Sequence, residues 1–276
     1  MPPRSPRPST PATDRTALVT GASSGIGEAF ARVFAANGWD LVITARREDR
    51  LRQLQHELES HYKVGVRLVA ADLADPATPM RLADELAGAG VNVDALVNNA
   101  GYGIAGPLLT SPWATHAAFL RVMVTSLVEL SYRFLPGMVD RGFGRIINVA
   151  SLAGLVPQTA GHTLYGASKT FVIRFSQSLA DEVRAQGVHV TAICPGFTHS
   201  EFHDVSGTRS MVRQLPAWMW MDAYTVARRG YDAVMAGEVV SVPGAANRVM
   251  AALSKALPER LVLAAVRRNA DKFRKR

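Results

Sequence analysis

Short apolar runs rich in branched residues alternate along the chain with longer segments of helical periodicity. The short runs are apolar at nearly every position, which is typical of strands buried on both faces of a parallel sheet. Predicted strands cover residues 16–20, 40–44, 65–70, 94–97, 144–149, 188–193 and 238–241. Predicted helices cover residues 25–37, 48–61, 77–88, 112–137, 164–186 and 223–236. The alternation predicts one doubly wound α/β domain over residues 16–245, with about seven parallel strands, helices on both faces and a ligand site at the carboxyl ends of the strands.

The two ends of the chain differ from this body in composition. Five prolines among the first eleven residues predict a disordered leader over residues 1–15, without the apolar stretch of a secretory signal. The formal charge of +8 is concentrated at the ends, and residues 259–276 alone hold seven basic and two acidic side chains. Because the body is close to neutral, we expect no nucleic-acid partner. The single cysteine, Cys194, and the absence of an apolar run of roughly 20 residues predict a soluble, cytoplasmic protein without a metal centre.

A glycine-rich turn, Thr-Gly-Ala-Ser-Ser-Gly-Ile-Gly over residues 20–27, follows the first predicted strand and opens the first helix. Its glycines allow a tight turn, a close backbone approach to a pyrophosphate and close packing of helix on strand. The helix N-terminus presents unpaired N–H groups to the anion. A plain turn is the alternative. The context favours a dinucleotide site that includes Gly21, Ser23, Ser24, Gly25, Ile26 and Gly27.

The second predicted strand ends in Thr44-Ala45-Arg46-Arg47, with no acid before Glu48. A carboxylate at this place would bind ribose hydroxyls, whereas a guanidinium can pair with the 2′-phosphate of NADP(H). Arg46 and Arg47 therefore favour NADP(H), with NAD(H) as the second choice. The alternative is that the two arginines only begin a solvated helix.

Tyr165 and Lys169 are four residues apart, so they share one face of a predicted helix. A neighbouring ammonium favours the phenolate form of a tyrosine, which suits the pair to acid–base chemistry. Ser151 stands at the end of the preceding strand, where it can meet them. The three residues together predict nicotinamide-dependent carbonyl or alcohol chemistry.

Together with Asp72-Leu73, Asn98-Asn99-Ala100-Gly101 and Pro195-Gly196, these motifs resemble the short-chain dehydrogenase/reductase (SDR) family over residues 16–245. The resemblance implies a Rossmann-like NAD(P)-binding oxidoreductase that forms homodimers or homotetramers through the long helices 112–137 and 164–186. By the same resemblance, Ser151 polarises the substrate oxygen, Tyr165 exchanges the proton, and Lys169 binds the nicotinamide ribose and lowers the tyrosine pKa. Further implied cofactor contacts are Asp72, Leu73, Asn99, Ala100, Gly101, Pro195, Gly196 and Thr198.

One position departs from the family pattern. The family usually carries an asparagine about 22 residues beyond the glycine that corresponds to Gly101, where it holds a water of the proton relay, and this chain has Met123 there. A thioether cannot replace the amide, so the relay must be altered. Ser126 or Thr125 could substitute, water alone could serve, or the chain could be a weakened enzyme or a nucleotide-binding non-enzyme. The presence of Ser151, Tyr165 and Lys169 favours an active enzyme.

The segment 197–222 is the expected substrate lobe. Its bulky apolar side chains suit a lipophilic carbonyl compound, although packing of the lobe on the body would require the same residue types. They are Phe197, Phe202, Met211, Leu215, Trp218, Met219, Trp220 and Met221. Among the neighbouring histidines, we expect His199 and His203 to be loop or surface residues and His162 to be a candidate substrate contact.

Residues 246–276 are expected to form a helical, basic extension. Beyond Pro258, an apolar stripe that starts at Leu261 and is bordered by basic side chains predicts peripheral contact with anionic lipid or packing against a partner subunit. A solvated basic tail is the alternative.

Overall fold

The computed structural model describes residues 15–157, 160–161, 163–202, 216–258 and 260–264. Most of the predicted leader and the residues after 264 lie outside the described residues, as do His162, His203, Met211 and Leu215. The strands of the central sheet are β1 Thr16–Thr20, β2 Asp40–Ala45, β3 Val66–Ala70, β4 Val93–Asn98, β5 Gly144–Val149, β6 Val188–Ile193 and β9 Val240–Ser241. The principal helices are α1 Gly25–Ala36, α2 Glu48–Tyr62, α3 Thr78–Gly88, α4 Trp113–Leu120, α5 Ser126–Asp140, α6 Thr163–Val183, α9 Ala223–Met235 and α10 Ala245–Ala256.

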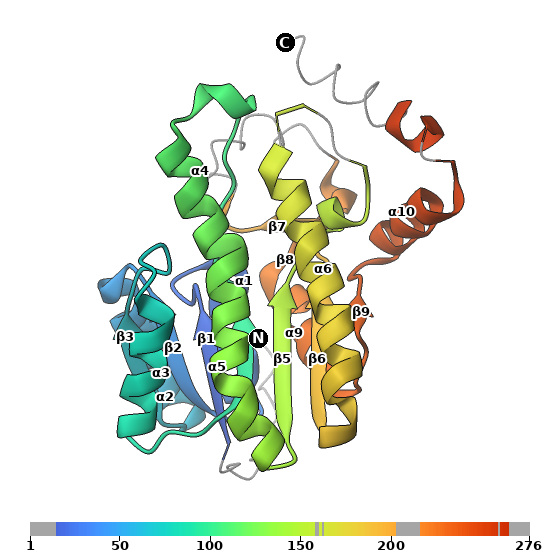
Figure 1. Ribbon diagram of the computed structural model, residues 1–276. Coiled ribbons are helices and arrows are strands. Elements are labelled where there is room, and N and C mark those ends of the chain that lie inside the picture. The colour runs from blue at the N-terminus through green and yellow to red at the C-terminus, as the bar shows by residue number, and fades with distance from the viewer. Residues whose placement is uncertain (1–14, 158–159, 162, 203–215, 259, 265–276) are drawn as a thin grey trace, which may run out of the picture.

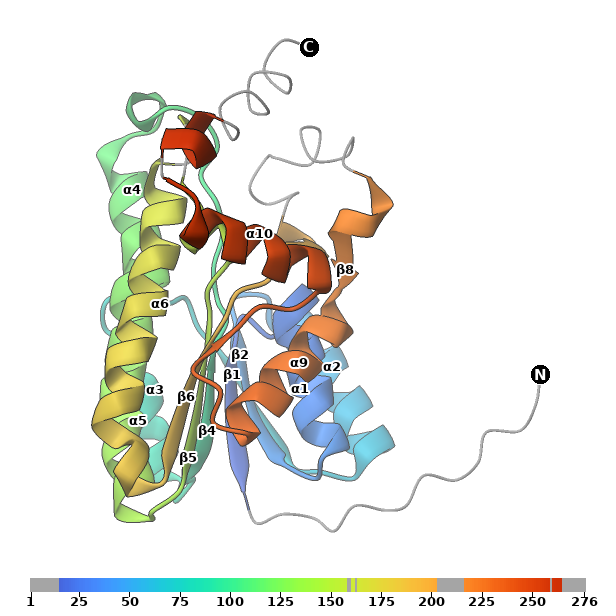
Figure 2. The same ribbon diagram turned by 90° about the vertical axis from the view of Figure 1, so that its right-hand side faces the viewer.

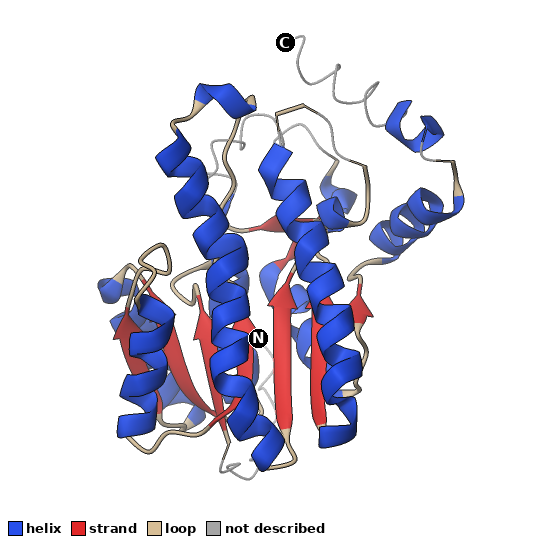
Figure 3. Ribbon diagram, viewed as in Figure 1, coloured by secondary structure: helices blue, strands red, loops and turns tan. Residues whose placement is uncertain are grey.

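The central sheet has the order β3-β2-β1-β4-β5-β6-β9, and every neighbouring pair is parallel (Figures 1 and 3). The predicted doubly wound fold is therefore confirmed. The strand order reverses between β1 and β4, and in such sheets the ligand crevice opens at this point, outside the carboxyl ends of the strands. The glycine-rich turn after β1 and residues 99–101 after β4 therefore flank the expected crevice.

Helices cover both faces of the sheet (Figure 2). One face is covered by α1, α2 and α9, and its core is centred on Phe30, Phe34 and Trp39. The opposite face is covered by α3, α5 and α6. Because each strand is buried on both sides, its near-continuous apolar sequence is explained by packing against both helical layers.

The single helix expected over residues 112–137 is interrupted. A π-helical turn spans Arg121–Thr125 between α4 and α5, so the segment forms a longer, bent unit rather than one regular helix. The predicted helix is therefore present, from Trp113 to Asp140, but the π turn within it was not predicted. Such π turns frequently mark functional sites, and this one contains Met123.

The expected substrate lobe begins with β7 Phe197–His199, which pairs in parallel with β8 Trp220–Asp222. This small sheet lies beyond the carboxyl ends of the central strands (Figure 1). The helix of the C-terminal extension, α10, ends at Ala256, and a further helical turn covers residues 260–264. Leu261, where the expected apolar stripe begins, belongs to this second turn, and the stripe beyond residue 264 lies outside the described residues.

Candidate active site

The glycine-rich turn is locked to the loop after β4 by two side chains. The Thr20 hydroxyl donates to the Val97 carbonyl at 3.1 Å and accepts the backbone N–H groups of Asn99 and Ala100 at 2.9 and 3.0 Å. The Asn99 amide donates to the carbonyl oxygens of Thr20 and Gly21 at 2.9 and 3.3 Å. Two loops that the sequence assigns to one cofactor are therefore held together before any ligand binds.

The turn also provides a backbone cradle that side chains would fill. Gly21 has a φ of 66° and Gly25 a φ of 58°, a region that glycine adopts without strain. A Cβ on Gly27 would lie 2.3 Å from the Gly21 carbonyl oxygen and 2.4 Å from Asn99 Nδ2. The close packing of α1 on the turn aims the helix N-terminus at the crevice, and this geometry fits a pyrophosphate.

At the end of β2, Arg47 turns back toward the glycine-rich turn. Its Nη2 donates to Ser24 Oγ at 2.9 Å and to Ser23 Oγ at 3.1 Å. Its Nη1 donates to the carboxylate of Glu201, at 2.7 Å. The structure thus places Arg47, Ser23 and Ser24 in one polar cluster. Arg46 lies instead close enough to Tyr102 for its charge to lower the pKa of that phenol, although burial raises it overall.

Asp72 and Leu73 lie on the other flank of the same end of the sheet. The Asp72 carboxylate accepts the Ala74 N–H at 3.0 Å and lies near Tyr102, whose pKa it raises. The Leu73 side chain is buried, and its carbonyl accepts the Ser126 hydroxyl at 2.8 Å. Asp72 and Leu73 therefore connect the segment after β3 with Tyr102 and with α5.

The three expected catalytic residues meet beyond the end of β5. Ser151 accepts the Ala153 N–H at 3.1 Å, which fixes its side chain, and its hydroxyl is hydrogen-bonded to that of Tyr165. Lys169 Nζ donates to the Val149 carbonyl at 2.6 Å and lies 5.8 Å from the centroid of the Tyr165 ring. A phenol, a hydroxyl and an amine therefore surround one point next to the crevice.

Burial dominates the electrostatics of this group. It raises the pKa of Tyr165, and the hydrogen bond from Ser151 offsets this only in part. It lowers the pKa of Lys169 to about 8, because the charged ammonium is removed from water. The expected lowering of the tyrosine pKa by Lys169 is therefore not seen in the protein alone, where the ammonium is engaged by the Val149 carbonyl.

Cys194 follows β6 behind the same group, and burial raises the pKa of its thiol to about 12. A thiol that stays protonated is a poor nucleophile.

Among the described residues, no three His, Cys, Asp or Glu side chains gather into a group that could hold a metal ion. No helix in the described part of the chain has the length and apolar character to cross a membrane.

Met123 is buried against the loop that follows β4. A Cβ on Gly101 would lie 2.9 Å from its sulfur, so the thioether packs directly on the Gly101 backbone. Of the two hydroxyls considered as substitutes, Ser126 donates to the Leu73 carbonyl and Thr125 is exposed. Neither replaces the missing amide in this structure.

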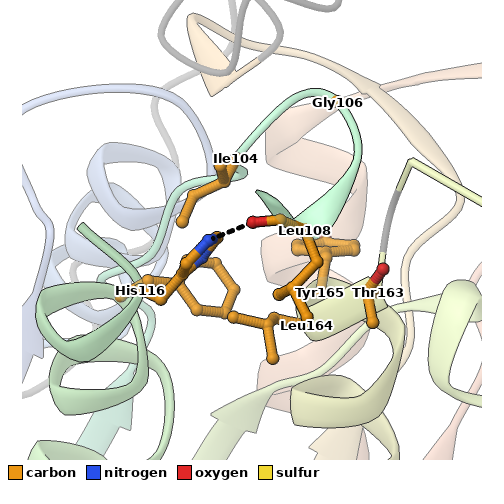
Figure 4. Close-up of a pocket in the computed structure, with 8 residues that line it drawn as sticks. Ile104, Gly106, Leu108, His116, Thr163, Leu164 and Tyr165 are labelled. Atoms are coloured by element: carbon orange, nitrogen blue, oxygen red, sulfur yellow. Dashed lines mark hydrogen bonds between the residues drawn. The ribbon is translucent and has the colours of Figure 1, made fainter. Parts of the chain in front are cut away.

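A pocket adjoins the Tyr165 side chain (Figure 4). Its lining is mainly apolar, and its polar groups are His116, Thr163 and the Tyr165 phenol. His116 Nε2 lies 2.8 Å from the Leu108 carbonyl. The pocket is lined by Ile104, Gly106, Leu108, His116, Phe119, Thr163, Leu164 and Tyr165.

The remaining predicted contacts follow β6. Pro195 and Gly196 lead into β7, where Thr198 is buried and donates to the Gly196 carbonyl at 3.2 Å. A Cβ on Gly196 would lie 2.6 Å from both amide atoms of Asn247, which explains how α10 packs here. The lobe also contacts the catalytic group, since the Phe202 ring lies 5.6 Å from that of Tyr165.

Sequence reasoning missed Glu201 and His116. Glu201 is 154 positions from Arg47, and no local pattern indicates that the two side chains pair. His116 lies on α4, before the π turn, and its meeting with Leu108 depends on how the preceding loop returns. His199, in contrast, is an exposed residue as expected, stacked on Trp220 at 4.8 Å.

Comparisons with known proteins point to one family. Residues 15–209 match the family model described as short chain dehydrogenase. Sulfoacetaldehyde reductase 2 of Chromohalobacter salexigens is 38% identical over 187 residues, which cover 67% of this chain and 73% of that protein. The human very-long-chain 3-oxoacyl-CoA reductase is 34% identical over 191 residues, covering 68% and 60%. A solved short-chain dehydrogenase from Sphingobium yanoikuyae in complex with NADPH superposes with a TM-score of 0.78 at 30% identity, covering 94% of this chain and 95% of that one.

Proposed function

We propose that this chain, which belongs to the short-chain dehydrogenase family and is an oxidoreductase, prefers NADPH. Its proposed substrate is a lipophilic carbonyl compound or secondary alcohol. The observation that carries this proposal is the hydrogen bond between the Ser151 and Tyr165 hydroxyls beside the buried amine of Lys169, at the edge of an apolar pocket.

When bound, the nicotinamide supplies the hydride to the carbonyl carbon in reduction or accepts it from the alcohol carbon in oxidation. The side chains manage the oxygen and its proton. In reduction, the Ser151 hydroxyl donates a hydrogen bond to the substrate oxygen, and Tyr165 transfers its phenolic proton to that oxygen as negative charge develops there. In oxidation, Tyr165 takes the proton back. Lys169 contributes a positive charge that favours the phenolate left after transfer.

The preference for NADPH is supported by Arg46 and Arg47, which follow β2 with no carboxylate between the strand and Glu48. The guanidinium of Arg47 and the hydroxyls of Ser23 and Ser24 already form one cluster, and a guanidinium binds phosphate with directed hydrogen bonds. We propose that this cluster receives the 2′-phosphate. The solved relative from Sphingobium yanoikuyae contains NADPH.

The lipophilic substrate is supported by the apolar lining of the pocket beside Tyr165. The relatives named above act on chemically different compounds, a small sulfonated aldehyde and a very long acyl thioester, so their names do not select a substrate. Among the described residues that line it, the pocket offers two polar side chains away from Tyr165, His116 and Thr163, and no arginine or lysine. This composition favours an uncharged, mainly apolar substrate.

We further propose a homo-oligomer that pairs α5 and α6 with the same helices of a second copy. Both helices expose aromatic side chains, with exposed fractions of 76% for Tyr132 and 42% for Phe171. Light scattering should give the mass of a dimer or tetramer, and Tyr132→Glu combined with Phe171→Glu should reduce it. An unchanged mass would place the interface elsewhere.

Tyr165→Phe tests the catalytic proposal. The variant removes the transferable proton and keeps the ring that packs against Phe202. The turnover rate with NADPH, measured on a panel of carbonyl compounds, should fall by about 10²- to 10⁴-fold. The dissociation constant of NADPH, measured by quenching of protein fluorescence, should change little. Retained turnover would contradict the role of the phenol.

A further inference from the structure

The Arg47 guanidinium has a carboxylate among its partners as well as the two serine hydroxyls. Its Nη1 lies 2.7 Å from Glu201 Oε2, while Nη2 contacts Ser23 and Ser24. Arg50, one turn along α2, lies 3.4 Å from the second oxygen of Glu201. Glu201 thus pairs with two guanidinium groups at the end of the glycine-rich turn. The hydrogen bond from Arg47, together with the charges of Arg47 and Arg50, holds the pKa of its carboxyl below the ordinary value.

The position of Glu201 follows from the path of its segment. A Cβ on Gly25 would lie 2.8 Å from Ser200 Cβ, so the chain after β7 passes directly over the glycine-rich turn. The neighbouring Thr198 is buried, which anchors the start of this passage. Glu201 belongs to the substrate lobe, but its carboxylate reaches the residues to which we assign the adenosine end of the cofactor.

We propose that Glu201 occupies the subsite of the 2′-phosphate and thereby determines how strongly the protein prefers NADPH to NADH. The inference rests on the proposed function of Arg47 as a phosphate ligand. A monoester phosphate carries a charge of about −1.5 to −2 at neutral pH, so it competes with the carboxylate for the same guanidinium donors. NADH carries no phosphate there and therefore does not compete with the carboxylate for the Arg47 donors. Glu201 is therefore a counter-ligand that acts against one cofactor only.

The size of this effect is limited by exposure. The side chains of Glu201 and Arg47 are 36% and 44% exposed, and exposed ion pairs contribute little because water screens them. Removing the carboxylate charge should therefore change the NADPH affinity by roughly two- to fivefold. The change should be toward tighter binding.

Glu201→Gln is the decisive variant, because it removes the charge and retains the shape and hydrogen-bonding capacity of an exposed side chain. Titration calorimetry of the full chain with NADPH and with NADH gives both dissociation constants. We expect the constant for NADPH to fall by roughly two- to fivefold and that for NADH to change less than about twofold. Glu48→Gln is the matched control, since Glu48 adjoins Arg47 in sequence but pairs with Arg52. It should leave the ratio of the two constants unchanged.

Two results would overturn the inference. Weaker NADPH binding by Glu201→Gln would mean that the carboxylate holds Arg47 in place for the phosphate, and an equal change for both cofactors would mean that Glu201 does not discriminate. Arg47→Met, measured in parallel, separates this failure from that of the proposed function. If Arg47→Met weakens NADPH and spares NADH, the phosphate role of Arg47 stands whatever Glu201 does. If it affects the two equally, the proposed cofactor preference fails first.

Discussion

The sulfur of Met123 packs on the backbone of Gly101. A Cβ added to Gly101 would lie only 2.9 Å from that sulfur. This contact joins the π turn between α4 and α5 to the loop after β4. In the family that the chain belongs to, an amide is usual at this position, so the contact marks where the proton path departs from the common pattern. The apolar side chain excludes a hydrogen-bonded water from the place that it fills.

Met123→Asn should therefore raise the catalytic rate. An amide beside Gly101 can bind a water on the path from Lys169, and acid–base elements of this kind are worth roughly 10²- to 10⁴-fold when complete. Since the surroundings are adapted to methionine, we expect a smaller gain, on the order of tenfold in kcat, at a stability cost of about 1–3 kcal/mol for burying an amide. Steady-state kinetics and urea unfolding measure the two effects.

Met123→Leu is the control for that substitution, because it preserves an apolar side chain of similar volume. Its kcat should equal that of the wild type. If Met123→Asn folds and binds NADPH but is no faster, the proton path does not pass this position.

The order of elements, the parallel sheet and the glycine-rich turn could be predicted because each depends on local sequence. Buried strands need apolar runs, and the turn at Gly21 and Gly25 needs residues that tolerate a positive φ. The interrupted helix could not be predicted. The π turn at Arg121–Thr125 inserts one residue into a helical repeat, and the segment around it is apolar at so many positions that the shift cannot be recognised.

The sequence selected Ser151, Tyr165 and Lys169, which the structure brings close together, but it did not predict their contacts. Ser151, Tyr165 and Lys169 have recognisable spacing, whereas the direction of the tyrosine pKa depends on how deeply the phenol is buried. The pairing of Glu201 with Arg47 depends on the course of the chain after β7, which no periodicity records. Long-range pairing of exposed side chains is therefore the information that the sequence lacks.

Gly27→Ala should destabilise the fold and abolish tight cofactor binding. The added methyl would lie 2.3 Å from the Gly21 carbonyl oxygen, a backbone atom that can move only with the whole turn. Overpacking of this kind costs about 1–3 kcal/mol. Thermal unfolding and NADPH titration should both show the loss.

Gly88→Ala makes the same chemical change at a position where a Cβ meets nothing within 4 Å, at the end of α3. Because alanine favours the helix and restricts the unfolded chain, this variant should be as stable as the wild type or up to about 1 kcal/mol more stable. NADPH binding should be unchanged. Equal destabilisation by both variants would show that the close approach at Gly27 is not the cause.

The C-terminal extension should bind anionic membranes. Val249, Leu253, Leu257 and Leu261 recur every fourth residue and are 45–60% exposed, and residues 259–276 hold seven basic side chains. Basic residues near an anionic surface contribute about 1 kcal/mol each. The full chain should therefore sediment with vesicles of phosphatidylserine and phosphatidylcholine, but not with phosphatidylcholine alone.

A chain that ends at Leu257 should lose most of this sedimentation while keeping its NADPH affinity. Equal binding by the two chains would remove the lipid contact. If the shorter chain instead has a smaller mass in light scattering, the extension packs against a partner subunit.

Lys169 should make the stability of the protein depend on alkaline pH. Burial lowers its pKa from 10.5 to about 8, so between these values the unfolded chain binds more protons at this residue than the folded one. The free energy of unfolding contributed by Lys169 therefore rises with pH across that interval and is least favourable below pH 8. Across the whole interval between the two pKa values, the rise in the free energy of unfolding would be about 3 kcal/mol.

Lys169→Met isolates this contribution, because methionine fills much of the same volume and does not titrate. The difference in unfolding free energy, wild type minus variant, should increase in favour of the wild type between pH 7 and pH 10. Urea unfolding at several pH values measures it, and the alkaline titration of Tyr165 and Cys194 cancels in the difference to the extent that neither depends on Lys169. A difference that stays constant with pH would mean that the Lys169 amine has the same pKa in the folded protein and in the unfolded chain.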